Sequence, residues 1–540
     1  MLRRHWVLAS ALAAQIAIWL SIPHSSVPGI NVVSQIGDMR SLFGIGEAIN
    51  NQFVAPWHPV ASFLTLPSLL WFDDPLLGGR IVWLLLHLSL TVLLYYIGRT
   101  LFSQMTAWFA IFSVVFGAPY YESSLSLSTE MCSFVLSLVP LALFARFRNR
   151  PIKSLDFAVL GLCCGAVTLS RVEYGFVFPV YLLLYLHRDS KYISMRALVM
   201  STLLALTMFV MIIMPQVIWV NVAHGTYGLM SPYEQVTFGS AAYYVPESLY
   251  QIAEARSIKT PWEVPELTLE TLTQTINTVI VLLANKSYFP HLLKLLVVGT
   301  AVYFIIQIPA TKTEHIATLV IAIAIPTLNV LATMTAGINL SARRLWSSNP
   351  FVLLLAGFGF SLVVHSMMDR WNLLIKSITK NSNLKMFIGS IAVVVILALT
   401  GPVTIWYMLT DETRLALHEQ ASAIAQLQRF FNNPEKQIMP VACPTVQVAF
   451  LIGTPYIPFR FDLPESVTPE IWVQKMREWG AEYVIFFPSI RARLPYSMRQ
   501  GIERFLTNSG AVVLKTDVCA LYQIPPLSAT MHGVTSDIPL

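Results

Sequence analysis

The sequence is poor in charge and in cysteine. Charged residues make up 12% of its 540 positions, about half the share that a soluble globular chain carries. The five cysteines and 11 histidines never take the spacing of a metal site, so no metal is expected. The polar C-terminal part also lacks a nucleophile motif and a glycine-rich phosphate loop. The scarcity of charge excludes a soluble enzyme, and nothing favours a metalloenzyme.

Apolar residues, in contrast, are abundant and grouped. They make up 55% of the chain, and the mean hydropathy is +0.62. Apolar runs recur through the first 410 residues, and each is near the roughly 20 residues that a bilayer crossing requires. The pattern predicts a polytopic α-helical membrane protein with about eleven transmembrane helices. The expected spans are 5–22, 80–97, 104–118, 128–145, 155–171, 174–187, 197–220, 291–308, 315–335, 350–367 and 386–409.

Two apolar segments need a separate interpretation. Residues 59–72 are short and contain two prolines, which favours an interfacial or re-entrant segment over a span. The run 5–22 follows MLRRHW and is not followed by a clear small-residue cleavage site. We therefore expect it to be a retained anchor.

The distribution of lysine and arginine predicts the orientation in the membrane. With the N-terminus in the cytoplasm, most of the basic residues of the first 410 lie in inner loops, as the positive-inside rule requires. These loops are RFRNRPIK (146–153), HRDSKYISMR (187–196), ATKTE (310–314) and DRWNLLIKSITKNSNLK (369–385). The long segments 23–79, 221–290 and 410–540 then face outward. The net charge of +6 follows from this topology and gives no sign of nucleic-acid binding.

The composition becomes that of a globular domain at Asp411. Helix-like and strand-like segments alternate from there, which predicts a small extracytoplasmic α/β domain at 411–540 after a transmembrane domain at 1–410. Without catalytic motifs, this domain is expected to be an accessory or acceptor-docking module. Cys443 and Cys519 lie in it, where a disulfide is permitted but not required.

Polar residues recur at the outer boundary of the membrane. The acids are Asp38, Glu122, Glu130 and Glu173, and the basic residues are His58, Arg171, Arg343 and Arg344. Each has an ordinary explanation. A loop aspartate is usually solvated, Glu130 can mark a helix start, and boundary arginines often reach for lipid headgroups.

Taken together, the same residues indicate chemistry on a lipid phosphate. An arginine binds phosphate oxygens through two nitrogens and offsets their charge as they leave. A carboxylate takes the proton of an attacking hydroxyl. The set therefore favours transfer from a lipid phosphate to an acceptor hydroxyl.

The order of the parts resembles the GT-C membrane glycosyltransferases, in the branch of the protein O-mannosyltransferases and the lipid A aminoarabinose transferases. Five segments carry the resemblance: SQIGDMRSLF around Asp38, GRIVWLLLHLSLTVLLYYIGRTLFS (79–103), SLSTEMCSFVL around Glu130, GAVTLSRVEYGFVFP (165–179) and RRLWSSNPFVLLLAG (343–357). GAEYVIF (480–486) also fits the exported domain of this branch.

The resemblance implies a glycosyltransferase that uses a polyprenyl-phosphate sugar. Asp38 then takes the place of the catalytic acid, and Glu130 that of a second acid near the acceptor, with Glu122 and Glu173 as further acidic candidates. Arg343, Arg344, His58 and Arg171 are the candidates for the donor phosphate.

Two departures from the family pattern matter. His58 stands where the family has a lysine, so this phosphate contact is weaker or depends on pH. No second acid adjoins Asp38, because its neighbours are Gly37 and Met39. The missing acid pair favours a donor without a bridging metal, and no cofactor is expected.

Two other classes remain open. A transporter or flippase for a lipid-linked solute would also be polytopic, but such proteins tend to show internal repeats, and the sequence has none. A non-catalytic assembly or sensor protein would explain the C-terminal domain but not the outer acids and arginines.

Overall fold

The structure is a computed structural model, and its contacts divide the chain into two units. It describes residues 2–22, 36, 39, 59–72, 74–146, 153–171, 174–189, 194–224, 349–374, 421–437, 439–443, 448, 452–454, 456–458, 468–478, 480–487, 496–516 and 519–525. A helical unit comprises Met1–Pro23, Ala55–Ser231 and Lys259–Thr410. A smaller unit comprises His24–Val54, Pro232–Ile258 and Asp411–Leu540.

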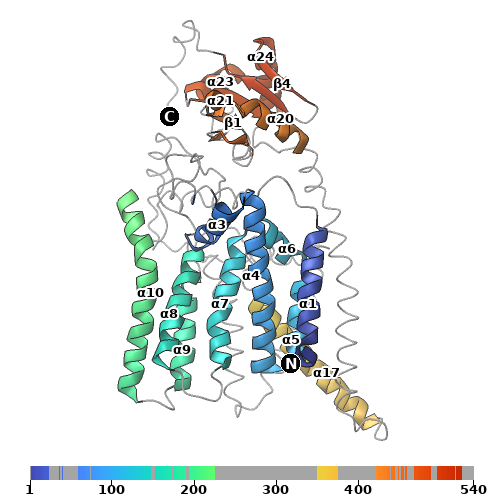
Figure 1. Cartoon of the computed structure of the whole chain (residues 1–540), viewed down its shortest axis with the longest axis vertical. Coiled ribbons are helices and arrows are strands. Elements are labelled where there is room, and N and C mark those ends of the chain that lie inside the picture. Colours follow the sequence, from blue (N-terminus) through green and yellow to red (C-terminus); the bar gives the residue numbers. More distant parts are fainter. Residues whose placement is uncertain are drawn as a thin grey trace, which may run out of the picture. The chain divides into compact units, whose positions relative to one another are not determined.

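The helical unit is a bundle in which most long helices stand side by side (Figure 1). Its helices are α1 (Leu2–Ser21), α3 (Pro59–Trp71), α4 (Pro75–Ile97), α5 (Gln104–Val115), α6 (Ala118–Leu125), α7 (Thr129–Arg146), α8 (Ser154–Ser170), α9 (Val177–Asp189), α10 (Met195–His224) and α17 (Asn349–Leu374). A π-helical turn, η1 (Gly98–Phe102), joins α4 to α5.

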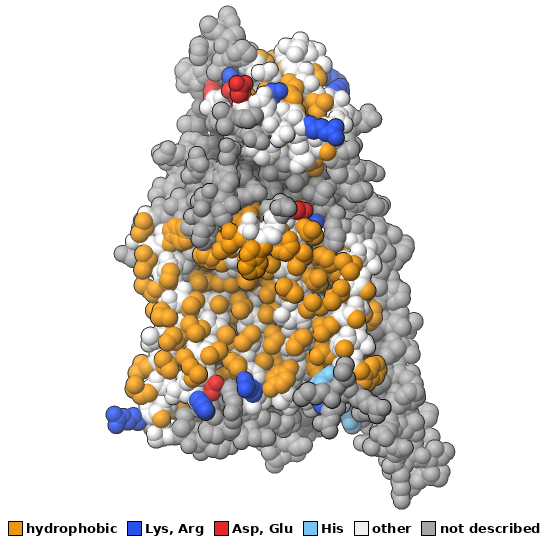
Figure 2. Space-filling view, in the orientation of Figure 1, with side chains coloured by type: hydrophobic (Ala, Val, Ile, Leu, Met, Phe, Trp, Pro, Cys, Tyr) orange, Lys and Arg blue, Asp and Glu red, His pale blue; other side chains and the backbone are white. Residues whose placement is uncertain are grey.

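Each predicted span that falls on described residues contains an α-helix, although α5 ends at Val115 rather than at 118 and α9 begins at Val177 rather than at 174. Three helical stretches of the described chain are long and apolar enough to cross a membrane: Leu76–Phe102, Thr129–Arg146 and Met195–Val222. The shorter apolar helices are His5–Ser21, Pro59–Trp71, Gln104–Val115, Ser154–Ser170, Val177–His187 and Pro350–Leu362. Hydrophobic side chains cover the face of this unit seen in Figure 2, and charged side chains lie near its margins. The predicted spans 291–308, 315–335 and 386–409 lie outside the described residues, so the number eleven stays a prediction.

The segment 59–72, predicted not to span, forms the short helix α3. Its 13 residues extend for about 20 Å, which is less than the hydrocarbon thickness of about 30 Å. Helix α3 packs mainly against α4.

Helix α4 has well-defined ends. Asp74 caps its start, because the amides of Leu76 and Leu77 donate to Asp74 Oδ1 at 2.9 and 3.2 Å. At its other end, Gly98 lies against α5. A side chain at position 98 would put its Cβ 2.9 Å from the Cα of Ala107, so only glycine permits this corner.

Helices α8 and α10 approach closely through two glycines one turn apart. A Cβ on Gly161 would lie 2.1 Å from the carbonyl oxygen of Ala205, and one on Gly165 would lie 2.9 Å from the Cβ of Ile212. This small-residue spacing lets two membrane helices come into backbone contact, which compensates for the weak hydrophobic drive between helices in lipid.

Helix α7 contains an internal proline and receives two side-chain hydrogen bonds beside it. Pro140 has no amide hydrogen, so it interrupts the helical hydrogen-bond ladder. Two buried tyrosines of α9 donate to carbonyls in this region, Tyr181 to Ser137 at 2.7 Å and Tyr185 to Pro140 at 2.8 Å. These two hydrogen bonds tie α9 to α7 beside the proline.

Helix α17 packs against α5, far from it in the sequence. The hydroxyl groups of Ser103 and Ser361 lie 2.9 Å apart, and the rings of Phe109 and Phe360 stack at 5.3 Å. Met105 and Ala356 complete the buried contact. A segment from the later half of the chain therefore closes one side of the bundle formed by the first half.

The smaller unit contains a mixed five-stranded sheet. Its strands are β1 (Val441–Cys443), β2 (Tyr456–Pro458), β3 (Tyr483–Phe486), β4 (Val512–Lys515) and β5 (Ala520–Gln523), in the order β2-β1-β3-β5-β4. Strand β1 is parallel to β2 and β3, whereas β5 is antiparallel to β3 and β4. Its helices are α20 (Ala421–Phe431), α21 (Pro434–Gln437), α23 (Pro469–Glu478) and α24 (Tyr496–Asn508).

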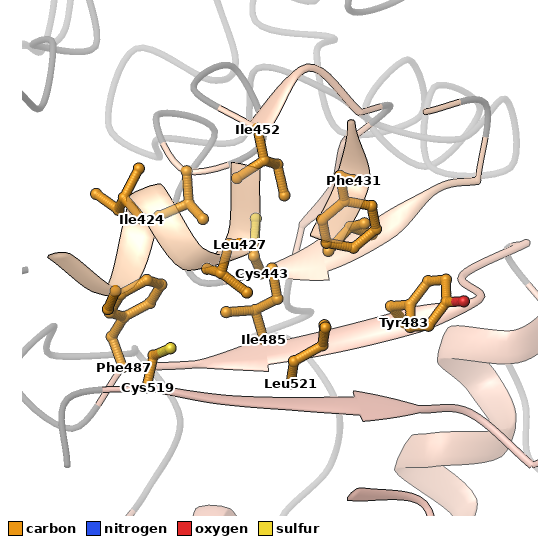
Figure 3. Packing of buried hydrophobic residues seen from close by; sticks show 13 residues of the cluster. Ile424, Leu427, Phe431, Cys443, Ile452, Tyr483, Ile485, Phe487, Cys519 and Leu521 are labelled. Atoms are coloured by element: carbon orange, nitrogen blue, oxygen red, sulfur yellow. The ribbon is translucent and has the colours of Figure 1, made fainter. Parts of the chain in front are cut away.

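Each face of the sheet packs on its own helices. In β3, Tyr483 and Ile485 belong to the cluster with α20, and Val484 and Phe486 belong to the cluster with α23 and α24. This is the alternation of side chains that a strand buried on both faces requires. Figure 3 shows the cluster of the first face, including Leu427 of α20.

Cys443 and Cys519, for which the sequence left a disulfide open, are both free and buried. Strand β3 separates their positions in the sheet. Cys443 ends β1, whose Ala442 pairs with Val484 of β3, and Cys519 directly precedes β5, whose Ala520 pairs with Phe486 of β3. Two strand spacings amount to about 9.5 Å. A disulfide needs Cα atoms about 4.4–6.8 Å apart, so the sheet keeps the two thiols from bonding.

We expect both thiols to react with a maleimide when the protein is purified under oxidising conditions, unfolded and labelled without reductant. Mass spectrometry of the peptides measures the labelling. In the folded protein, Cys519 is expected to react slowly. It is buried, and burial raises the pKa of its thiol, although a hydrogen bond from Thr516 opposes the shift. A requirement for reductant before labelling would contradict this prediction.

Candidate active site

The helix α5 is too short to cross a bilayer. Its 12 residues extend for about 18 Å, against the roughly 30 Å of hydrocarbon. The sequence had predicted a span to 118, but α5 ends at Val115 and Gly117 separates it from α6. The next segment of the chain therefore begins within the depth of the bundle, where neighbouring helices cover it.

Aromatic rings of α6 reach down along α4. Tyr120 stacks on His87 with ring centroids 6.0 Å apart, and Tyr121 meets the same ring edge-on at 5.0 Å. His87 lies about three turns into α4. Tyr120 also contacts Phe134 of α7 at 6.3 Å. These buried rings form an apolar layer between α4 and α7.

Above this layer, the turn between α6 and α7 is fastened to α4. The indole nitrogen of Trp83 donates to the carbonyl of Ser128 at 2.8 Å, and Arg80 Nε donates to the carbonyl of Leu125 at 3.4 Å. Within the turn, Leu127 has a φ of 49°. That left-handed conformation is an outlier for a bulky residue.

The turn ends at Ser128, which caps α7 and binds the first acid of that helix. The amide of Glu130 donates to Ser128 Oγ at 3.2 Å. In return, Ser128 Oγ donates to Glu130 Oε2. Glu130 therefore serves the helix start, as the ordinary interpretation of the sequence expected. The residue is nevertheless buried, with an exposure of only 3%.

Glu130 also forms an ion pair with Arg171. The Nη1 atom of Arg171 lies 2.5 Å from Glu130 Oε1, and both side chains are buried. Arg171 is the first residue after α8, and its amide donates to the carbonyl of Val167 at 2.9 Å. The hydroxyl groups of Ser133 and Ser170 lie 3.0 Å apart and add a second link between α7 and α8.

The pair brings together two residues that the sequence had assigned to separate tasks. Glu130 was expected near the acceptor, and Arg171 was one of the candidates for binding the donor phosphate. A charge buried at this depth depends on its partner, so neither residue acts independently of the other. Sequence reasoning missed Arg80 and Trp83. Arg80 did carry a signal, since it stands at the outer end of a predicted span against the positive-inside bias.

The other predicted site residues have no described side chains. Asp38, His58, Glu173, Arg343 and Arg344 lie outside the described residues. The backbone of Glu122 belongs to α6, but its side chain is likewise outside them. Their assignments stay predictions.

Comparison with known proteins gives matches of structure only. No protein-family model and no curated protein sequence matches the chain. ArnT from Cupriavidus metallidurans, bound to undecaprenyl phosphate, aligns with a TM-score of 0.51 at 10% identity, over 96% of this chain and 98% of that one.

The archaeal oligosaccharyltransferase AglB from Archaeoglobus fulgidus, in complex with an inhibitory peptide and a dolichol-phosphate, also aligns. Its TM-score is 0.51 at 12% identity, over 90% of this chain and 70% of that one. The apo form of the Archaeoglobus enzyme gives a TM-score of 0.55 at 10% identity. The chain therefore has the GT-C fold that its sequence motifs implied.

Proposed function

We propose that the protein is an integral membrane glycosyltransferase that transfers a sugar from a polyprenyl-phosphate donor to an acceptor on the extracytoplasmic side of the membrane. The observation that carries this proposal is the GT-C fold, which aligns along nearly the whole of ArnT. The similar proteins are solved with undecaprenyl phosphate and with dolichol-phosphate, which makes a lipid phosphate the first donor class to test.

The buried polar cluster suits such a reaction. Arg171 is held by a carboxylate, lies at the end of a helix and is largely shielded from water. In such surroundings a guanidinium attracts developing negative charge more strongly than in water. Together with Arg343, Arg344 and His58, it is proposed to serve the donor phosphate.

The proposed step is a single displacement. The acceptor oxygen attacks the anomeric carbon while the bond from that carbon to the phosphate oxygen breaks. Asp38 takes the acceptor proton, and the lipid phosphate leaves with the bonding electron pair. One displacement inverts the anomeric configuration, as in one-step glycosidases. Glu130 is proposed to orient the acceptor and to hold Arg171 in place through their ion pair.

Purified protein, incubated with a polyprenyl-phosphate sugar and a membrane extract as acceptor, is expected to release the lipid phosphate and to form a glycosylated product. Because no metal is proposed to bridge the donor, the rate should stay unchanged when EDTA is added. A flippase would move the intact donor across vesicles without breaking it. Movement of the intact donor would contradict the proposed transferase and favour the transporter.

The orientation of the chain can be tested separately. Reporter fusions after Arg150, Arg188 and Lys380 should report the cytoplasm. Fusions after Ser240 and at the C-terminus should report the outside, which makes the smaller unit extracytoplasmic. A cytoplasmic C-terminus would contradict both the basic-residue distribution and the side proposed for the reaction.

A further inference from the structure

The turn between α6 and α7 is strained and yet buried. Leu127 keeps a φ of 49°, although L-residues with branched or bulky side chains avoid that region. Its side chain is fully buried. Such a conformation persists only where the surrounding structure holds it, and conformations of this kind concentrate at functional sites.

Residues on one face of α4 stabilise this conformation of the turn. Gly79 packs under Leu127, since a Cβ on Gly79 would lie 2.6 Å from Leu127 Cδ2. Arg80 and Trp83 bind the carbonyls at the two ends of the turn, Leu125 and Ser128. Three residues within about one helical turn thus fix the turn by packing at its centre and by hydrogen bonds at its ends.

The held turn leads directly to the ion pair. Trp83 fixes the carbonyl of Ser128, the hydroxyl of Ser128 binds Glu130, and Glu130 binds Arg171. We propose that Trp83 is a positioning residue that orients the Glu130–Arg171 pair through the strained Leu125–Ser128 turn. This inference rests on the proposed glycosyl transfer, because positioning acquires meaning only with a substrate at the pair.

Trp83 suits this task because its ring cannot move. The indole is fully buried, so rotation would have to displace packed neighbours. Its only polar atom donates at 2.8 Å. A group held on a rigid helix in this way positions its partner more accurately than a loop residue does.

The first test replaces Trp83 with Phe, which keeps an aromatic ring and removes the N–H donor. We expect kcat to fall about 10-fold, as the loss of one well-placed hydrogen bond allows, while the KM for the donor stays within about two-fold. Trp108→Phe is the matched control. Trp108 of α5 is also buried, but its indole nitrogen has no hydrogen-bond partner among the described residues. An equal fall of kcat in both variants would overturn the inference.

A second pair of variants presses on the turn without changing a hydrogen bond. Gly79→Ala pushes on Leu127, whereas Gly78→Ala pushes on Phe72, with a Cβ 2.7 Å from its ring. The two substitutions are the same in size and adjacent on one helix. We expect kcat to fall in Gly79→Ala only. A fall confined to Gly78→Ala would contradict the role of the turn.

A double substitution separates positioning from general damage. In a Glu130→Gln background, Trp83→Phe is expected to change kcat less than about two-fold, since the carboxylate it positions is gone. If the wild-type protein transfers no sugar, the proposed function fails. The inference is then tested by thermal unfolding of the wild type, Trp83→Phe, Glu130→Gln and the double variant. Non-additive shifts in Tm would show that Trp83 and Glu130 are coupled. Additive shifts would show that they are not coupled and would contradict the inference.

Discussion

Replacing Arg171 with Met is expected to lower the free energy of unfolding of the helical unit by about 3–5 kcal/mol. The substitution leaves the carboxylate of Glu130 buried without the cation that lies 2.5 Å from it. Glu130→Gln should be costly for the converse reason. The double variant, Glu130→Gln with Arg171→Met, should lose less unfolding free energy than the two single variants lose in sum. No unpaired charge then remains buried. Titration with SDS, followed by tryptophan fluorescence, measures these differences.

The smaller unit offers a matched control. Arg477 and Glu482 also approach to 2.5 Å, but their side chains are 25% and 34% exposed. An exposed pair contributes about 0–1 kcal/mol, so Arg477→Met should have little effect. Losses of equal size at the two pairs would mean that burial does not govern the energy of the Glu130–Arg171 pair.

Replacing Asp38 with Asn is expected to reduce turnover by at least about 100-fold. General base catalysis contributes about 10²–10⁴-fold, and Asn keeps the shape of the side chain without its basicity. Donor binding should stay within a few-fold of wild type, since the proton moves only during the reaction. Release of polyprenyl phosphate measures turnover, and equilibrium binding of the donor measures affinity.

Two results would change this mechanism. Near-normal turnover in Asp38→Asn would move the base to another acid. Glu122 would then be preferred to Glu130, because both oxygens of Glu130 are already bound by Arg171 and Ser128. Retention of the anomeric configuration in the product, seen by NMR, would exclude a single displacement.

The helices could be predicted from the sequence because lipid leaves few alternatives. A backbone that crosses hydrocarbon must satisfy its own hydrogen bonds, so a long apolar run becomes a helix. The predicted span 197–220 is found inside α10, Met195–His224, and 128–145 is found as α7, Thr129–Arg146. Hydropathy sufficed for these elements.

The contacts of the candidate site could not be predicted in the same way. Glu130 and Arg171 were each recognised at a helix end, but which helix ends meet depends on packing that hydropathy does not encode. The φ of Leu127 is set by its surroundings, and nothing in the letters SLSLST announces it. The Gly161 and Gly165 contact is different. The spacing GLCCG is readable, and it indicates a close helix pair without saying that α10 is the partner.

The packing of α17 on α5 has a consequence for synthesis. Ser103 and Ser361, which form a hydrogen bond, are 258 positions apart. At about 5–20 residues per second, the ribosome adds Ser361 roughly 13–50 s after Ser103. During that interval Met105 and Phe109 lack their contacts with Ala356 and Phe360 of α17. The hydroxyl of Ser103 has a local partner in the hydroxyl of Thr106, 2.9 Å away. Ser103 can therefore remain hydrogen-bonded before α17 is synthesised.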